Sequence, residues 1–269
     1  MRWSVFWETL RGELRGTILW GLGLGVFGFI TTSILPDSTG MQEMVEALEA
    51  LPPFFFQMLG VDDLSVLATP AGFISLRYFL TAAVIFSIWA VLSGLNVITN
   101  DETRGIANMV VSLPVSRGRI IFERILANIV PALVIPMIGL GGLALGMTAN
   151  PNAQTDLTPL ALATLMLTPV GLFILNLTVL VGAAVPRRGL VAGVAGGFIA
   201  TSFLLKSVAG IARSDFADTL AELSVYQQSD AVAVIRDGFP VITALIMLAL
   251  AAAMAVAAAG FFQSRDLAA

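Results

Sequence analysis

Residues 100–124 of the chain read NDETRGIANMVVSLPVSRGRIIFER, a polar and basic segment between two long apolar runs. When the first half of this segment is drawn as a helix, Ile106, Met109, Val110 and Leu113 recur at helical spacing. This spacing puts them on one face of a short amphipathic helix. A helix of this length is marginal on its own. We therefore expect its apolar face to press against another protein.

The second half of the segment begins another helix. Pro114 ends the first one, because proline lacks the N–H for the helical ladder and disfavours a helical residue before it. Ser116 is suited to cap the next helix, whose first turns carry Arg117, Arg119 and Arg124 before the chain turns apolar. The segment thus predicts one short helix followed by the start of a long one.

The composition of the chain indicates a partly lipid environment. Hydrophobic residues make up 57% of the sequence and charged residues 12%, and the mean hydropathy is +0.91. A water-soluble domain of this length would expose much of that apolar surface. The chain has no cysteine and no histidine, which excludes a disulfide framework and removes the commonest metal ligand and general base.

The apolar runs predict an all-α polytopic membrane protein, with six spans in a single domain that covers residues 1–269. A helix at 2–15, with Trp3, Phe6 and Trp7 largely opposite its charged residues, is expected to lie flat on the membrane surface; a frayed tail is the alternative. The start of the chain has features of a signal peptide, but the apolar run that follows is long enough to span and no cleavage site follows it, so we expect it to be retained. The six predicted spans are 16–35, 74–98, 120–147, 158–185, 190–205 and 240–262.

The basic residues sort to one side of this arrangement. Six spans place both termini on one side, together with segment 100–124 and the turn at Arg187 and Arg188. The opposite side holds most of the acidic residues, in long loops at 36–73 and 206–239. Because cytoplasmic loops are enriched in Lys and Arg, we expect both termini in the cytoplasm.

The energy for transport is expected to come from a partner. A proton- or sodium-coupled carrier would usually bury a carboxylate at mid-membrane to bind its ion, and the spans offer none there. Arg77, Glu123 and Arg124 lie at span ends, where we expect them to reach the lipid headgroups. The chain also has no GxxxxGK[ST] phosphate-binding loop. The amphipathic segment is the expected contact with an ATP-driven partner.

Segment 100–124 resembles the cytoplasmic loop between the second and third spans of ABC-2 type transporter permeases. In that family an acidic residue and a glycine lead into an apolar helix, followed by Leu-Pro-Val-Ser-Arg and a basic residue that opens the third span. Two positions depart from the pattern: Asn108 stands where a glutamate is common, and Glu123 where a small residue is common. The matching positions are Glu102, Gly105, Leu113, Pro114, Val115, Ser116, Arg117 and Arg124.

The resemblance implies a transporter subunit without a catalytic site of its own. In the family, the helix at 101–113 is a coupling helix that docks on a separate ABC ATPase. Two ATPase copies would carry ATP and Mg²⁺, so this chain is expected to bind no cofactor. A second permease subunit, identical or different, and membrane lipid are the other expected partners, and nucleic acid is not one. The implied activity is export across the inner membrane of a bacterial or archaeal cell. The residues expected to contact the ATPase are Glu102, Arg104, Gly105, Ile106, Met109, Val110, Leu113 and Pro114.

Small residues within the spans indicate close helix contacts. Gly189, Gly193 and Gly197 recur every fourth position in the fifth span, as do Gly21 and Gly25 in the first. Such rows let helices approach closely in lipid. The functional interpretation is a dimer interface built from spans 1 and 5, and packing within one protomer is the alternative.

Asn176 is the best-placed candidate for a substrate path, although most asparagines within spans simply bond a neighbouring helix. Other functions stay open at this point. They are a permease that serves metalloenzyme maturation and a passive channel or structural anchor. A membrane-embedded enzyme is disfavoured, because the carboxylates cluster in loops and histidine is absent.

Overall fold

The computed structural model describes residues 3–52, 64–103, 117–185, 187–212 and 215–264, and within these ranges the regular structure is helical, without a strand. Six helical segments are long and apolar enough to cross a membrane, which confirms the prediction of an all-α polytopic membrane protein. Five are single helices, and the second is built from three consecutive pieces. The six are α1 (Ser4–Ser33), α4–η2–α5 (Pro70–Ile74, Ser75–Phe79 and Leu80–Thr103), α7 (Arg117–Ala149), α8 (Leu157–Ala184), α9 (Arg188–Ala212) and α13 (Val241–Ser264).

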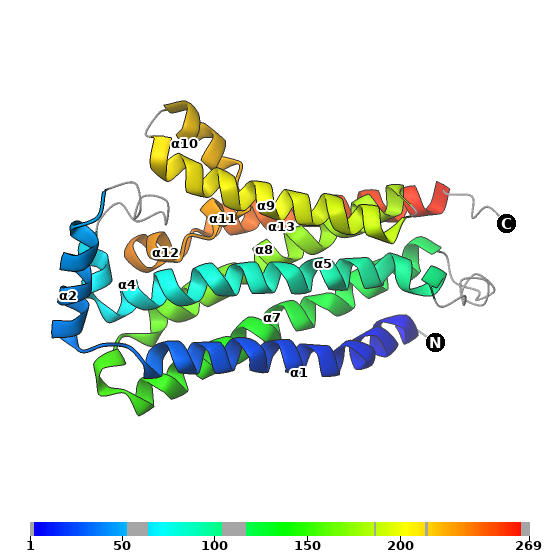
Figure 1. Ribbon diagram of the computed structural model, residues 1–269. Helices are drawn as coiled ribbons and strands as arrows, with labels where there is room; N and C mark the ends of the chain where they lie inside the picture. Colours follow the sequence, from blue (N-terminus) through cyan, green and yellow to red (C-terminus); the bar gives the residue numbers. More distant parts are fainter. Residues whose placement is uncertain (1–2, 53–63, 104–116, 186, 213–214, 265–269) are drawn as a thin grey trace.

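The long segments run along one axis as a bundle (Figure 1). The first turn of α1 and the last turn of α13 lie at the same end, as an even number of spans requires. We name this the terminal end and the opposite one the distal end. α2 (Ser38–Glu49) crosses the distal end. The short helices lie toward the same end: η1 (Leu64–Ala68), η3 (Pro151–Ala153), α10 (Asp215–Glu222), α11 (Val225–Gln228) and α12 (Ala231–Asp237).

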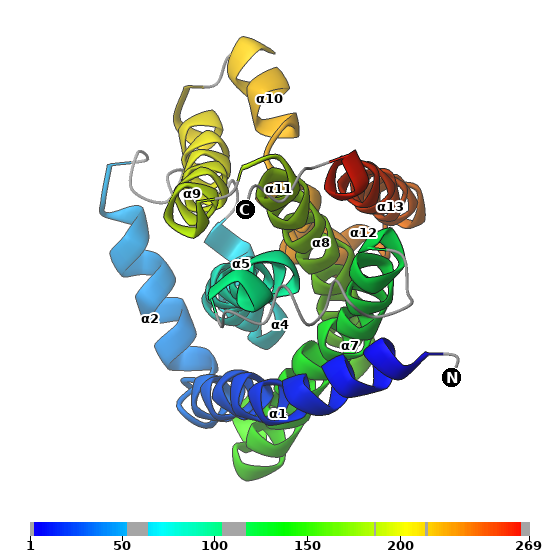
Figure 2. The ribbon, with the colours of Figure 1, turned by 90° about the vertical axis from the view of Figure 1, so that its right-hand side faces the viewer.

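α8 lies at the centre of the bundle and packs against α5, α7, α9 and α13 (Figure 2). In its most apolar stretch 72% of the residues are buried, against 17% in α9. Thr164 and Thr178 donate their hydroxyl protons to the carbonyl four residues earlier, at 2.8 Å each, which satisfies them where no water is present. Asp156 caps the start of α8: the hydrogen bond from the backbone N–H of Thr158 lowers the pKa of this carboxyl.

α1 packs mainly against α7, and glycines bring the two backbones together. Gly25 and Gly142 face each other so closely that a Cβ on Gly142 would overlap the backbone of Gly25. Nearby, the Thr32 hydroxyl of α1 donates to the Leu143 carbonyl of α7 at 3.3 Å. Close packing of small residues drives helix association in lipid. The two helices therefore form a tightly joined pair.

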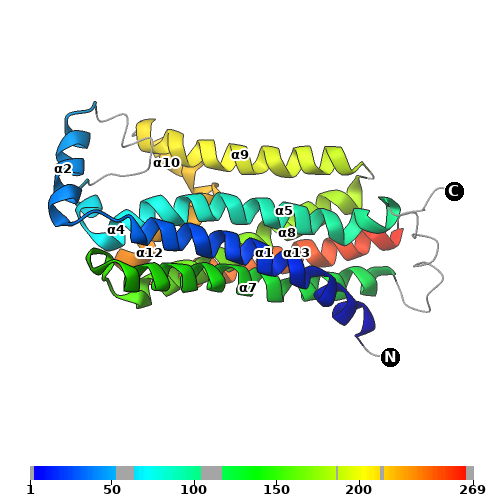
Figure 3. The same ribbon diagram turned by 60° about the horizontal axis from the view of Figure 1, so that its bottom comes forward.

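α1 is one continuous helix, so no break separates the predicted surface helix at 2–15 from the predicted span at 16–35, but its first turns bend away from the axis of the bundle (Figure 3). No proline interrupts the junction, and Thr17 Oγ1 donates to the Glu13 carbonyl across it at 2.8 Å. A helix of 30 residues is about 45 Å long, more than the apolar core of a bilayer. The excess length lets its first turns extend past that core at the terminal end.

The predicted fifth span and the loop after it also need correction. The helix runs over Arg188–Ala212 and is longer than the predicted span at 190–205. Within the predicted loop 206–239, α10 agrees with the helical spacing of Phe216, Leu220 and Leu223, whereas α11 and α12 were not predicted, and Tyr226 is only 2% exposed. Capping explains the short helices: Ser224 Oγ accepts from the Tyr226 N–H at 3.2 Å, and Asp230 Oδ1 from the Val232 N–H at 2.9 Å.

Candidate functional site

The predicted coupling helix at 101–113 is described only in part. Residues 101–103 form the last turn of α5; the side chain of Glu102 is outside the description, and so are residues 104–116. What the structure describes are the two helices that flank the segment, the end of α5 and the start of α7, both at the terminal end. The predicted contact residues outside the described ranges are Arg104, Gly105, Ile106, Met109, Val110, Leu113 and Pro114.

Glu123, in the second turn of α7, joins that helix to the start of α1. Its side chain is buried; the carboxylate accepts from Arg119 Nε at 2.8 Å and from the backbone N–H of Phe6 at 3.2 Å. The carboxylate pairs with the backbone N–H of Phe6, which has no partner within the first turn of α1. Its negative charge is also favourable near the positive, N-terminal end of that helix. The expectation that Glu123 reaches the lipid headgroups is therefore wrong, because its carboxylate is engaged within the bundle.

Arg124 links α7 to α5. Its Nη1 atom donates to the carbonyl of Val97 at 2.9 Å, and its own carbonyl accepts from Asn128 Nδ2 at 2.9 Å. A positive charge near the last turns of a helix is favourable. The two helices that flank residues 104–116 are thus bonded directly to each other.

A third polar contact brings in α9. Arg188 Nη2 donates to Asn96 Oδ1 of α5 at 3.2 Å, so this asparagine bonds a neighbouring helix. Together these contacts connect α1, α5, α7 and α9 at the terminal end. Within the described part of the chain, no group of three or more His, Cys, Asp or Glu side chains is placed to hold a metal ion. We name the connecting residues the polar end cluster: Asn96, Arg119, Glu123, Arg124 and Arg188.

Asn176 lies in the buried interior of α8. Its Nδ2 atom donates to the Leu172 carbonyl at 2.8 Å, while its Oδ1 atom is buried with no hydrogen-bond partner. Asn128 of α7 has the same pattern, with Oδ1 buried and unpartnered. Two buried amide oxygens with spare accepting capacity are compatible with a polar path through the bundle. The role of Asn176 in such a path stays a prediction.

The five predicted packing glycines divide into two groups. Gly21 and Gly25 contact Ile138 of α7 within the chain, where a Cβ on Gly25 would come within 3.2 Å of the Ile138 carbonyl. For the glycines of α9 a Cβ would meet no atom within 4 Å, so that side of α9 is open. The first group is therefore accounted for by packing within one chain. The second group comprises Gly189, Gly193 and Gly197.

The polar contacts of the segment after α9 were not predicted from the sequence. Tyr226 donates its hydroxyl proton to Ser87 Oγ of α5 at 2.9 Å, and Lys206 forms an ion pair with Asp230 at 3.2 Å. The signal in the sequence was weak: a serine and an aspartate at capping positions, in a stretch that otherwise has the composition of a loop.

The chain matches a protein-family model over residues 5–263, described as the multidrug efflux system permease Rv1217c, C-terminal domain. The match covers all but the ends of the chain, and the chain therefore belongs to this permease family. None of the curated proteins matches it. Six apolar helices and a permease family together identify a multi-pass membrane protein that serves transport.

Proposed function

We propose that this permease is the membrane subunit of an ABC-2 type exporter, in which a separate ATPase moves the segment at 101–113. The family match over residues 5–263 supports an efflux permease, and the resemblance of segment 100–124 to ABC-2 permeases supports the ATPase contact. The namesake of the family is an efflux permease for more than one drug, which supports export as the direction for this chain. The sequence has no GxxxxGK[ST] loop, which favours an energy source on a partner.

The polar end cluster suggests how motion would spread from the segment. A displacement of residues 104–116 pulls on the end of α5 and on the start of α7, which Arg124 already connects. Glu123 carries the motion to α1, and Arg188 carries it to α9. Because α1 and α7 pack closely along their length, they would move as one body. Movement of the short segment at 101–113 would thus be transmitted to four helices, α1, α5, α7 and α9.

A second permease subunit would dock on α9. The exposed side of this helix carries Gly189, Gly193 and Gly197, together with exposed Leu190 and Val194. Small residues on an open helix face favour close helix contact in lipid. α1 is a weaker candidate for the same role, because its glycines at 21 and 25 are covered by α7. Two ATPase copies would complete the assembly.

The test replaces the apolar face of the predicted coupling helix. Met109→Glu and Val110→Glu place charge where the ATPase groove is expected to be apolar, and they should abolish stimulation of the copurified ATPase. Asn108→Asp adds the same charge off that face by helical periodicity and serves as the matched control. Membrane insertion, measured by extraction of the membrane fraction, should be unchanged in all three variants. Normal ATPase stimulation in both glutamate variants, or cargo movement without ATP, would refute the proposal and favour a passive channel.

A further inference from the structure

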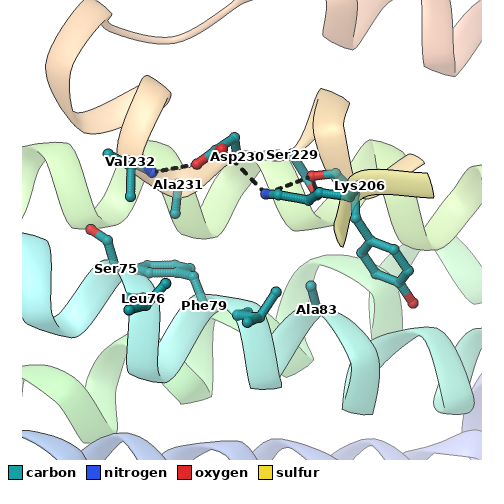
Figure 4. Close-up of a pocket in the computed structure, with 11 residues that line it drawn as sticks. Ser75, Leu76, Phe79, Ala83, Lys206, Ser229, Asp230, Ala231 and Val232 are labelled. Atoms are coloured by element: carbon teal, nitrogen blue, oxygen red, sulfur yellow. Dashed lines mark hydrogen bonds and ion pairs between the residues drawn. The ribbon is translucent and has the colours of Figure 1, made fainter. Parts of the chain in front are cut away.

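A cavity opens on the distal half of the bundle, between α5 with η2 on one side and the end of α9 with α11 and α12 on the other (Figure 4). It is a shallow, open groove, and most of the space within it is continuous with solvent. Figure 4 shows Lys206 and Asp230 on one wall and Phe79 on the facing wall. Leu76 and Leu80 extend the apolar wall. We name this the distal cavity. One of its walls is charged and the other is apolar, an arrangement that suits an amphiphilic ligand.

Lys206 is the only lysine of the chain, and its ammonium group can donate one further hydrogen bond. Nζ donates to the Tyr226 carbonyl at 3.3 Å and to Asp230 Oδ2 at 3.2 Å. Both contacts are longer than the usual charge-assisted hydrogen bond of about 2.7–2.9 Å. An ammonium has three N–H donors, so one remains for a ligand. The side chain is 13% exposed, which leaves it accessible from the cavity.

The other polar groups of the distal cavity are already engaged as donors or acceptors. Asp230 Oδ1 accepts from the Val232 N–H, and Oδ2 accepts from Lys206. Ser75 and Ser229 give their hydroxyl protons to backbone carbonyls. The free N–H of Lys206 therefore decides the chemistry of the ligand: it must offer a hydrogen-bond acceptor, and a negative charge strengthens the bond.

The depth of the cavity indicates where such a ligand comes from. Lys206 lies in the last two turns of α9 (Arg188–Ala212), so its ammonium is near the distal end of that helix. Basic side chains at this level meet lipid headgroups. A phospholipid supplies both halves of the required ligand, an anionic phosphate and an apolar chain.

We propose that the distal cavity binds a membrane phospholipid, with its phosphate on Lys206 Nζ and its apolar part against Leu76, Phe79 and Leu80. The site ties α5, α9 and the α11–α12 segment together at the end of the bundle opposite the polar end cluster. It is independent of the ATPase and of the direction of transport.

The first experiment uses the single lysine as a reporter. The full chain in neutral detergent is treated with an acetylating N-hydroxysuccinimide ester, and mass spectrometry follows acetylation of Lys206 with the N-terminal amine as internal reference. Dioctanoyl phosphatidylglycerol should slow the reaction at Lys206 severalfold. Dioctanoylglycerol, which lacks the phosphate, and inorganic phosphate at equal concentration should not. Equal protection by dioctanoylglycerol would show an apolar site only, equal protection by inorganic phosphate would show a site for the free ion, and either result, or no protection, overturns the proposal.

The second experiment uses variants whose effects have opposite signs, with bound dioctanoyl phosphatidylglycerol counted by native mass spectrometry. K206Q should weaken binding roughly tenfold, the usual worth of a hydrogen bond to a charged group, whereas K206R should retain it. D230N keeps an oxygen for the Val232 N–H and releases Lys206 from its counter-ion, so it should bind severalfold more tightly. D237N is the matched control, because Asp237 is an exposed acid outside the cavity.

The expected changes in binding have opposite signs for K206Q and D230N, which makes the result decisive. A site for a cationic amphiphile would respond in the reverse order, with D230N weakening binding and K206Q strengthening it. If D230N behaves like D237N, or if K206Q binds as tightly as the parent chain, the proposal fails. Should K206Q not fold, the comparison of K206R, D230N and D237N carries the same test.

Discussion

Glu123 plays two roles that substitutions at this residue can separate. Glu123→Ala removes the acceptor of the Phe6 N–H and of Arg119, and should lower the free energy of unfolding by about 1–3 kcal/mol. Glu123→Gln keeps an oxygen for Phe6 but turns its amide donor toward Arg119 and loses the ion pair, so it should cost less than the alanine variant. Thermal unfolding in detergent measures both, with Arg119→Gln as the control for the ion pair. Equal losses for the alanine and glutamine variants would contradict the capping role.

The bond between Tyr226 and Ser87 predicts an asymmetric pair of mutants. In Tyr226→Phe, Ser87 still donates to the Ala83 carbonyl at 2.7 Å, and the cost should be about 1 kcal/mol. Ser87→Ala instead leaves the buried Tyr226 hydroxyl without its partner and should cost up to about 3 kcal/mol. The double mutant should cost less than the sum, because the two residues share one interaction. Additive losses in the melting experiment would show that the bond contributes nothing.

Among the helices, the α1–α7 contact offers a test with a control on the adjacent residue. Gly142→Ala would force a Cβ into the backbone of Gly25, whereas a Cβ at Gly141 meets no atom within 4 Å. We expect Gly142→Ala to lower stability by about 1–3 kcal/mol through overpacking. Gly141→Ala should raise it slightly, since alanine is the better helix former by ~1 kcal/mol. Melting temperatures of the two variants compare the positions directly. Equal behaviour would mean that α1 and α7 are not in close contact.

Most of the helical elements could be predicted from the sequence, because apolar length is a strong signal for membrane spans. The junction near Gly16 was not, since a change from charged to apolar composition does not stop a helix and Thr17 bonds back across it. α11 and α12 were missed for the opposite reason: short helices depend on caps such as Ser224 and Asp230 and on burial that only the tertiary structure supplies.

Only the part of the candidate site that has a sequence motif could be predicted. The amphipathic pattern of residues 101–113 is visible in the sequence, whereas the polar end cluster is not. Apart from the i,i+4 pair Arg119–Glu123, its contacts join residues far apart in the chain, such as Phe6 with Glu123 and Asn96 with Arg188. No periodicity relates such positions. At the level of the bundle, they become neighbours only when four helices meet at one end.

For the whole molecule, the orientation in the membrane is the prediction on which the proposed ATPase contact depends. The chain has no cysteine, so single cysteines report their own side. Asn152→Cys lies in an exposed turn at the distal end, and Ala184→Cys lies exposed at the end of α8 beside the arginine turn. Because the basic residues gather at the terminal end, a membrane-impermeant maleimide should label Asn152→Cys in intact cells. It should label Ala184→Cys only after permeabilisation. The reverse pattern would place the segment at 101–113 outside the cell, where no ATPase could drive it.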